Sequence, residues 1–151
     1  TPTQIHRYMS RISGPLLDRI DIQCEIKAVP YSTLKDTAPG ESSEVMRERV
    51  MRARKVQQQR FAAYNAEAQK PVHCNAQMTP KLVREFCQLD AQGDKMLSYA
   101  MDKMGLSARA YDRILKVART IADLDNSSSI GMSHLSEAIG YRSLDREDWC
   151  G

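Results

Sequence analysis

Arg19 is the first residue whose setting in the sequence suggests chemistry. It follows the turn signal Gly14-Pro15 and directly precedes an alternating, strand-like run that begins at Ile20. At an edge where a loop meets a sheet, a guanidinium can cross a subunit boundary and neutralise charge on a transferring phosphoryl group. The other interpretation is a surface arginine paired with Asp18 or Asp21, which adds little stability. The local pattern alone favours this second interpretation.

Arg109 is the second candidate, because it breaks a local rule. Ser107 is a good N-cap, so Arg109 falls in the first turn of the helix that follows. A cation there is disfavoured by a few tenths to about 1 kcal/mol, since the helix dipole is positive at this end. However, backbone amides at a helix N-terminus and an arginine side chain directed to the same point can together bind an anionic phosphate. A solvated arginine that pairs with Asp112 remains the alternative.

A basic run is the third candidate. At 100° per residue its cations cover most of a helix circumference rather than one stripe, and Glu44 and Glu48 dilute them. A solvated face is therefore favoured over a nucleic-acid site. The run contains Arg47, Arg49, Arg52, Arg54, Lys55 and Arg60, of which Arg47, Arg52, Arg54 and Lys55 are the candidate DNA contacts.

Other kinds of site find no support in the sequence. There is no G-x-x-x-x-G-K-[ST] phosphate loop and no apolar run that ends in Asp-Glu. The three histidines lie far apart in sequence, and no cysteines form a C-x-x-C pair, so we expect no metal site. We expect free thiols in a reducing cytosol, and no run is apolar and long enough to cross a bilayer. The four cysteines are Cys24, Cys74, Cys87 and Cys150.

Length and composition indicate a helical, globular chain. The 151 residues are 42% hydrophobic and 27% charged, which is enough for one ordinary domain. With only two Phe and one Trp, the core must rest on Leu, Ile, Val, Met and Ala. The net charge of +3 does not by itself argue for nucleic acid. Because the first residue is Thr rather than Met, we expect a segment of a longer protein.

The N-terminal part is expected to hold the end of a helix, a loop and one strand. Residues 1–11 are predicted to be the end of a helix, which Gly14-Pro15 is expected to stop. The apolar residues at helical spacing are Ile5, Tyr8, Met9 and Ile12. Residues 20–28 alternate strictly between apolar and polar, which predicts a half-buried strand. A lone strand cannot satisfy its own hydrogen bonds, so we expect its partners outside these 151 residues.

The remainder is predicted to be a helical bundle. Pro30 and the Ser/Thr residues that follow it predict a linker. Capping residues then predict successive helices over 43–69, 79–89, 90–104, 107–124 and 133–144. In the fourth helix the predicted inner face is Tyr111, Ile114, Leu115, Ala118, Ile121 and Ala122.

Two long motifs together resemble one family. Residues 8–22, which include Ser13-Gly14-Pro15-Leu16-Leu17-Asp18-Arg19, and residues 106–124, which include Ser107-Ala108-Arg109, are similar to the magnesium-chelatase-like AAA+ ATPases of the competence protein M group. The closing residues 134–139 with Tyr141-Arg142 also fit this family. Two such motifs in the right order favour the phosphate-directed interpretations of Arg19 and Arg109.

The resemblance implies roles for these residues. Arg19 would be an arginine finger that acts in trans, with Asp18 beside it, and Arg109 would be a second sensor that contacts the ATP of its own subunit. The fold would be mainly α, a helical lid preceded by a helix-loop-strand remnant of the α/β ATPase core. The implied boundaries are 1–29 for the remnant, 30–42 for the linker, 43–144 for the lid and 145–151 for a tail.

The resemblance also implies partners and activity for the whole protein. It would be a cytoplasmic ring, usually a hexamer, that hydrolyses ATP with Mg²⁺ and drives DNA branch migration in competence and recombination. The present residues alone would be inactive and bind no cofactor, because both Walker motifs are missing. The alternatives are the motor subunit of a magnesium-chelatase-type complex and a non-enzymatic module that binds DNA or protein. The basic run tips the balance slightly toward DNA.

Overall fold

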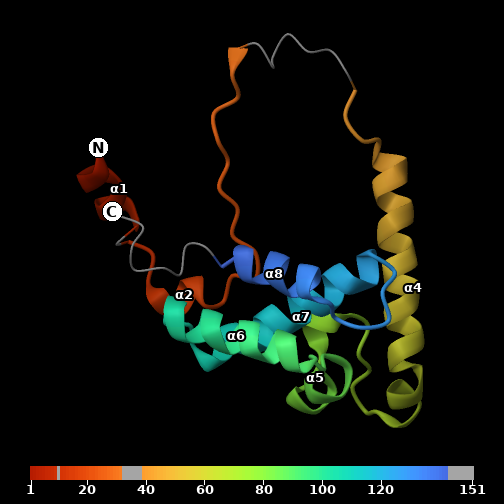
Figure 1. Ribbon diagram of the computed structural model, residues 1–151. Helices are drawn as coiled ribbons and strands as arrows, with labels where there is room; N and C mark the ends of the chain where they lie inside the picture. Colours follow the sequence, from red (N-terminus) through yellow and green to blue (C-terminus); the bar gives the residue numbers. More distant parts are fainter. Residues whose placement is uncertain (10, 32–38, 143–151) are drawn as a thin grey trace.

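The described part of the protein is built from helices. Figure 1 shows the computed structural model, which describes residues 1–9, 11–31 and 39–142. In these residues no strand forms, which confirms a mainly α fold. The elements are α1 (Pro2–Met9), α2 (Gly14–Leu17), α4 (Ser43–Glu67), the 3-10 helix η1 (Asn75–Gln77), α5 (Pro80–Phe86), α6 (Ala91–Met104), α7 (Ala108–Leu124) and α8 (Met132–Gly140).

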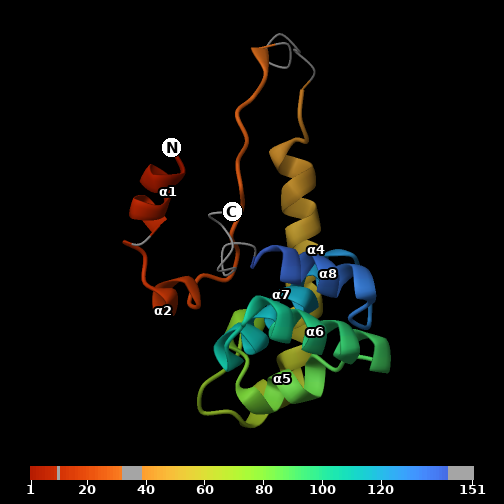
Figure 2. The same cartoon turned by 60° about the vertical axis from the view of Figure 1, so that its left-hand side comes forward.

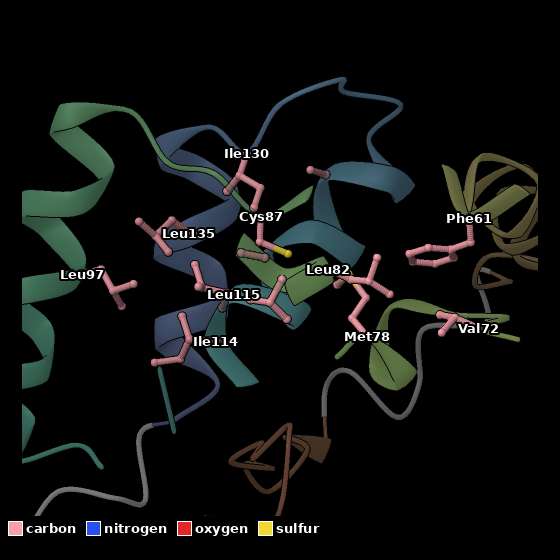
Figure 3. Close-up of a cluster of buried hydrophobic side chains, with 14 residues drawn as sticks. Phe61, Val72, Met78, Leu82, Cys87, Leu97, Ile114, Leu115, Ile130 and Leu135 are labelled. Carbon is pink, nitrogen blue, oxygen red and sulfur yellow. The ribbon is translucent and has the colours of Figure 1, made fainter. Parts of the chain in front are cut away.

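Helix α7 forms the centre of the bundle. It packs against α4, η1, α5 and α8, and its apolar stripe is buried because Ile114, Leu115 and Ala118 recur at helical spacing. In Figure 3, Ile114 and Leu115 lie among side chains from α6 (Leu97), α8 (Leu135) and α5 (Leu82). Tyr111, predicted to point inward, is instead 41% exposed, because it borders an open groove beside α5.

Local capping chemistry places the helix starts. The side chains of Thr79, Asp90 and Ser107 accept hydrogen bonds from the backbone amides three residues on, at 3.4, 2.7 and 3.2 Å, as predicted. Helix α4 is capped by Ser42, one residue before the predicted cap. Helix α8 begins at Met132, because His134 Nδ1 accepts a hydrogen bond from the Gly131 amide at 2.9 Å.

The N-terminal segment differs from the prediction in two ways. Residues 20–28 form no strand, because the described part of the chain offers them no strand to pair with. The Gln23 amide instead donates to the carbonyl of Tyr141 at 2.9 Å. Gly14-Pro15 starts α2 rather than only ending a helix, since proline suits the first helical turn. The predicted linker, 30–42, lies partly outside the described residues, and the tail, 145–151, and the end of the last helix, to 144, lie entirely outside them.

Helix α4 extends well beyond the bundle. Figures 1 and 2 both show it beside the other helices with its first half projecting past them. Its second half is held by Gln57 and Phe61, and the ring of Phe61 meets that of Phe86 edge to face, with centroids 5.8 Å apart. Residues 43–52 are all exposed.

Gly105 provides a stability test of the α6–α7 connection. Its φ of +60° lies in the left-handed region, and its amide and that of Leu106 both bond to the Met101 carbonyl. We expect Gly105→Ala to lower the free energy of unfolding by about 1–2 kcal/mol, because a Cβ is strained at this φ. Gly140→Ala is the matched control: its Cβ meets nothing within 4 Å, and we expect no loss. Urea unfolding of the chain measures both variants, and an equal response would contradict the argument.

Candidate functional site

The two arginines singled out in the sequence line one cavity. Its volume is about 620 Å³, within the range of small-molecule sites, and it lies between the N-terminal segment and helices α7 and α8. Arg19 lines it from the N-terminal segment, and Arg109 lines it from the first turn of α7. The fold therefore brings together two candidates that are 90 positions apart in the sequence.

The carboxylates next to Arg19 in sequence are engaged elsewhere. Asp18 accepts a hydrogen bond from the Ser107 hydroxyl at 3.0 Å, and Asp21 forms an ion pair with Arg113. Arg19 and Arg109 are exposed, and within the described residues neither guanidinium group has a hydrogen-bond or ion-pair partner. The alternative in which Arg19 pairs with Asp18 or Asp21 is therefore wrong in this structure.

The cavity carries charges of both signs, but its carboxylates are not all free. Glu137 accepts a hydrogen bond from the Tyr141 hydroxyl at 2.8 Å, and this bond raises the pKa of Tyr141 above its ordinary value. Lys116 donates to the Ala76 carbonyl at 3.3 Å. Among the described residues, the lining thus keeps two unpaired guanidinium groups, those of Arg19 and Arg109, against one unpaired carboxylate, that of Asp112, and this excess of positive charge favours an anion. The cationic lining residues are Arg19, Arg109, Arg113 and Lys116, and the acidic ones are Asp21, Asp112 and Glu137.

Two residues that organise this region were not predicted from the sequence. Arg142, which follows α8, is only 1% exposed and donates a hydrogen bond to the Ile20 carbonyl. Arg113 pairs with Asp21 across 92 positions. No local pattern could reveal either contact, because each joins segments that are distant in the chain. Arg142 belongs to the closing family motif, but nothing in that motif indicates what it contacts.

A buried polar network joins α4 and η1 to α7. Asp123, a buried residue of α7, accepts hydrogen bonds from Arg60 of α4 and from Asn75 Nδ2 of η1, the latter at 2.8 Å. Arg119 Nε donates to the same carboxylate at 3.1 Å. Asn75 also donates to the hydroxyl of Thr120, which lines the cavity. The network therefore contacts the cavity wall through Thr120.

The network shifts the pKa values of its members. Burial alone would raise the pKa of Asp123, but hydrogen bonds from Arg60 and Asn75 and the charges of Arg60 and Arg119 bring it below its ordinary value. Burial lowers the pKa of Arg119, and the Asp123 charge opposes that change. Cys87 packs nearby, and burial raises the pKa of its thiol to about 11, so the thiol stays protonated at neutral pH.

The basic run on α4 divides into separate parts. Arg60 belongs to the buried network, and Arg49 pairs with Glu41 at 2.8 Å. The four candidate DNA contacts are exposed, and none of them lines the cavity that holds Arg19 and Arg109. These four are Arg47, Arg52, Arg54 and Lys55.

The described residues form neither a metal-binding cluster nor a membrane-spanning helix. No group of three or more His, Cys, Asp or Glu side chains has the geometry to hold a metal ion there. In the same part of the chain, no helix has the length and apolar character needed to span a membrane.

Comparisons with known proteins cover almost the whole chain. The model of the family "Magnesium chelatase, subunit ChlI C-terminal" matches residues 40–142, and that of "Magnesium chelatase, subunit ChlI" matches residues 1–34. The chain is 44% identical to the uncharacterized protein YifB of Escherichia coli and 41% identical to the competence protein ComM of Haemophilus influenzae, in each case over 97% of this chain and 27% of the relative. An uncharacterized protein of Mycobacterium tuberculosis is 32% identical over 90% of this chain and 26% of its own length. The chain thus spans about a quarter of the length of these curated relatives.

Proposed function

The chain belongs to the magnesium chelatase ChlI family, and from this premise we propose that it is the lid and arginine-finger segment of a ring-forming AAA+ ATPase. The observation that carries the proposal is the shared cavity, in which the side chains of Arg19 and Arg109 both lack partners among the described residues. Two free guanidinium groups at one opening are suited to stabilise charge on a phosphoryl group in transfer.

ATP and Mg²⁺ would act in the intact protein. The sequence of this chain holds no phosphate loop, so backbone amides from another part of the protein would have to cradle the triphosphate. Arg19 and Arg109 would contact its phosphate oxygens, and Mg²⁺ would supply further positive charge against the triphosphate. These residues would supply positive charge without taking or giving a proton, since arginine stays protonated.

The shared cavity also bears on which nucleotide each arginine meets. A finger acts on the nucleotide of a neighbouring subunit, whereas the family resemblance gives Arg109 the nucleotide of its own subunit. Because both side chains line one cavity, we propose that they contact the same triphosphate. We therefore assign Arg109 to the same neighbouring nucleotide as Arg19.

For the whole protein we propose a cytoplasmic ring, a hexamer as is usual in this class, that remodels branched DNA. Support comes from its similarity to a relative named competence protein. The second candidate is a chelatase-type motor, which the name of the matching family favours. The test is ATP turnover by the intact protein, with and without branched DNA, in wild type and in Arg19→Ala and Arg109→Ala. Turnover that DNA stimulates and both substitutions abolish supports the DNA motor. Turnover that ignores DNA but needs both arginines supports the chelatase-type motor.

DNA binding by α4 is a separate candidate, favoured by the four exposed cations on its projecting half. We expect the chain to bind duplex DNA at low salt, with an affinity that falls as the salt concentration rises. Arg54→Ala/Lys55→Ala should reduce the slope of log affinity against log salt by about 0.9 for each phosphate that the variant no longer neutralises. The control, Lys81→Ala/Arg84→Ala on α5, removes the same charge from exposed positions elsewhere. An equal reduction of the slope in both variants would contradict a DNA surface on α4.

A further inference from the structure

We propose that Ser107 and Arg142 are positioning residues that hold Asp18, and through it the adjacent Arg19, at the start of α7. We call Asp18, Ser107 and Arg142 the clamp. The inference rests on the proposed function, because it concerns how the two arginines come to face one phosphate.

Ser107 links the two arginines through a single hydroxyl group. Its oxygen accepts the Ala110 amide at 3.2 Å and thereby caps α7, the helix that carries Arg109. Its hydrogen is donated to Asp18 at 3.0 Å, across 89 positions of the chain. A shift of the first turn of α7 relative to Asp18 must break one of these two bonds. The position of Arg109 is therefore coupled to that of the residue next to Arg19.

Arg142 holds the same segment from the other side. Its Nη1 donates to the Ile20 carbonyl, and its Nη2 lies 3.7 Å from a carboxylate oxygen of Asp18. Because Arg142 is 1% exposed, these contacts are shielded from water. The residues before and after Arg19 are thus both fixed, while the Arg19 side chain stays exposed.

The Asp21–Arg113 ion pair contributes to the same arrangement. Asp21 is the other carboxylate within reach of Arg19 in sequence, and Arg113 occupies it from α7. If these contacts only attached the N-terminal segment to the bundle, Arg19 could form an ion pair with Asp18 or Asp21 as well. Instead, the segment is held through Asp18, Ile20 and Asp21, which leaves the guanidinium directed to the cavity that it shares with Arg109.

The test compares two capping residues in the intact protein. Ser107→Ala removes the cap of α7 and the donor to Asp18, whereas Thr79→Ala removes the cap of α5 and touches no part of the clamp. We expect Ser107→Ala to lower kcat for ATP by about 10- to 100-fold with KM unchanged, because a misplacement of about 1 Å can cost two orders of magnitude. Thr79→Ala should keep the wild-type kcat.

A second variant separates positioning from loss of the helix cap. Asp is as good an N-cap as Ser, so Ser107→Asp keeps α7 capped, but a carboxylate cannot donate to Asp18 and repels it. We expect the same loss of kcat as in Ser107→Ala. Adding Asp18→Asn to Ser107→Asp restores a hydrogen bond between positions 18 and 107, in which the amide at position 18 donates to the carboxylate at position 107. This double variant should recover at least part of the turnover.

The outcomes distinguish this inference from the proposed function. If Arg19→Ala and Arg109→Ala abolish turnover while Ser107→Asp keeps it, the clamp is overturned and the proposed function stands. If Arg19→Ala and Arg109→Ala leave turnover intact, the proposed function itself fails. Loss of turnover in Ser107→Asp with recovery on adding Asp18→Asn supports the clamp, since a merely disrupted fold would not be rescued by a second substitution.

Discussion

Arg19→Ala is expected to lower the ATP turnover of the intact protein by about 10³- to 10⁵-fold, the range measured for arginine fingers. The guanidinium stabilises charge that is largest in the transition state, so kcat should fall far more than KM rises. Arg109→Ala should cost about 10²- to 10³-fold, as for loss of one preorganised donor. Arg84→Ala is the control, because Arg84 is exposed on α5 and does not line the cavity.

Mixing experiments then show in which subunit each arginine acts. Subunits with Arg19→Ala but an intact phosphate loop are combined with subunits that keep Arg19 but lack the phosphate-loop lysine. Turnover should return, because each ring then contains interfaces with one intact loop and one intact finger. Since both arginines line one cavity, we expect Arg109→Ala to be rescued in the same mixture. Rescue of Arg19→Ala alone would return Arg109 to the nucleotide of its own subunit, and rescue of neither would contradict action in trans.

Asp123→Ala should lower the free energy of unfolding by about 3–5 kcal/mol. The substitution leaves Arg119, whose side chain is 3% exposed, and Arg60, at 11%, without their shared carboxylate. It also removes the joint acceptor that holds α4 and η1 on α7. Asp102→Ala is the control, because Asp102 is exposed on α6 and has no partner in the described residues, so its change should stay within about 0.5 kcal/mol. Urea unfolding at pH 7 compares the three proteins.

The Asp123 contribution should also depend on pH. Burial opposes ionisation of this carboxylate, yet its hydrogen bonds and cationic neighbours depress its folded-state pKa below the ordinary value of 3.8. Its stabilising effect is therefore fully present above the unfolded-state pKa and is lost as pH falls through the lower, folded-state pKa. The difference in unfolding free energy between wild type and Asp123→Ala should shrink below about pH 4. A difference that grows in acid would mean that the folded-state pKa is raised.

Local sequence was sufficient to predict the longer helices of the bundle and the family, but not the short helices α2 and η1. The caps at Thr79, Asp90 and Ser107 and the stop at Gly105 were predicted correctly, because each signal lies within about one helical turn of the backbone groups that it satisfies. The family could be recognised from two contiguous motifs for a similar reason: each is complete within one stretch of the chain. Local chemistry was also enough to mark Arg109 as unusual, since a cation in a first helical turn breaks a rule that needs no tertiary contact.

Assembly of the site, by contrast, depended on tertiary contacts. Residues 20–28 have the periodicity of a strand but form none, because a strand depends on partners and those partners were expected outside these 151 residues. Periodicity could not separate the members of the basic run, whereas folding pairs Arg60 with Asp123, at 11% side-chain exposure, and leaves Arg54 exposed. Arg19 and Arg109 came to line one cavity because Asp18 reached Ser107 and Arg142 reached Ile20, contacts that span 89 and 122 positions. Pairings over such distances form only when the packed bundle brings the two segments together, so no local pattern in the sequence encodes them.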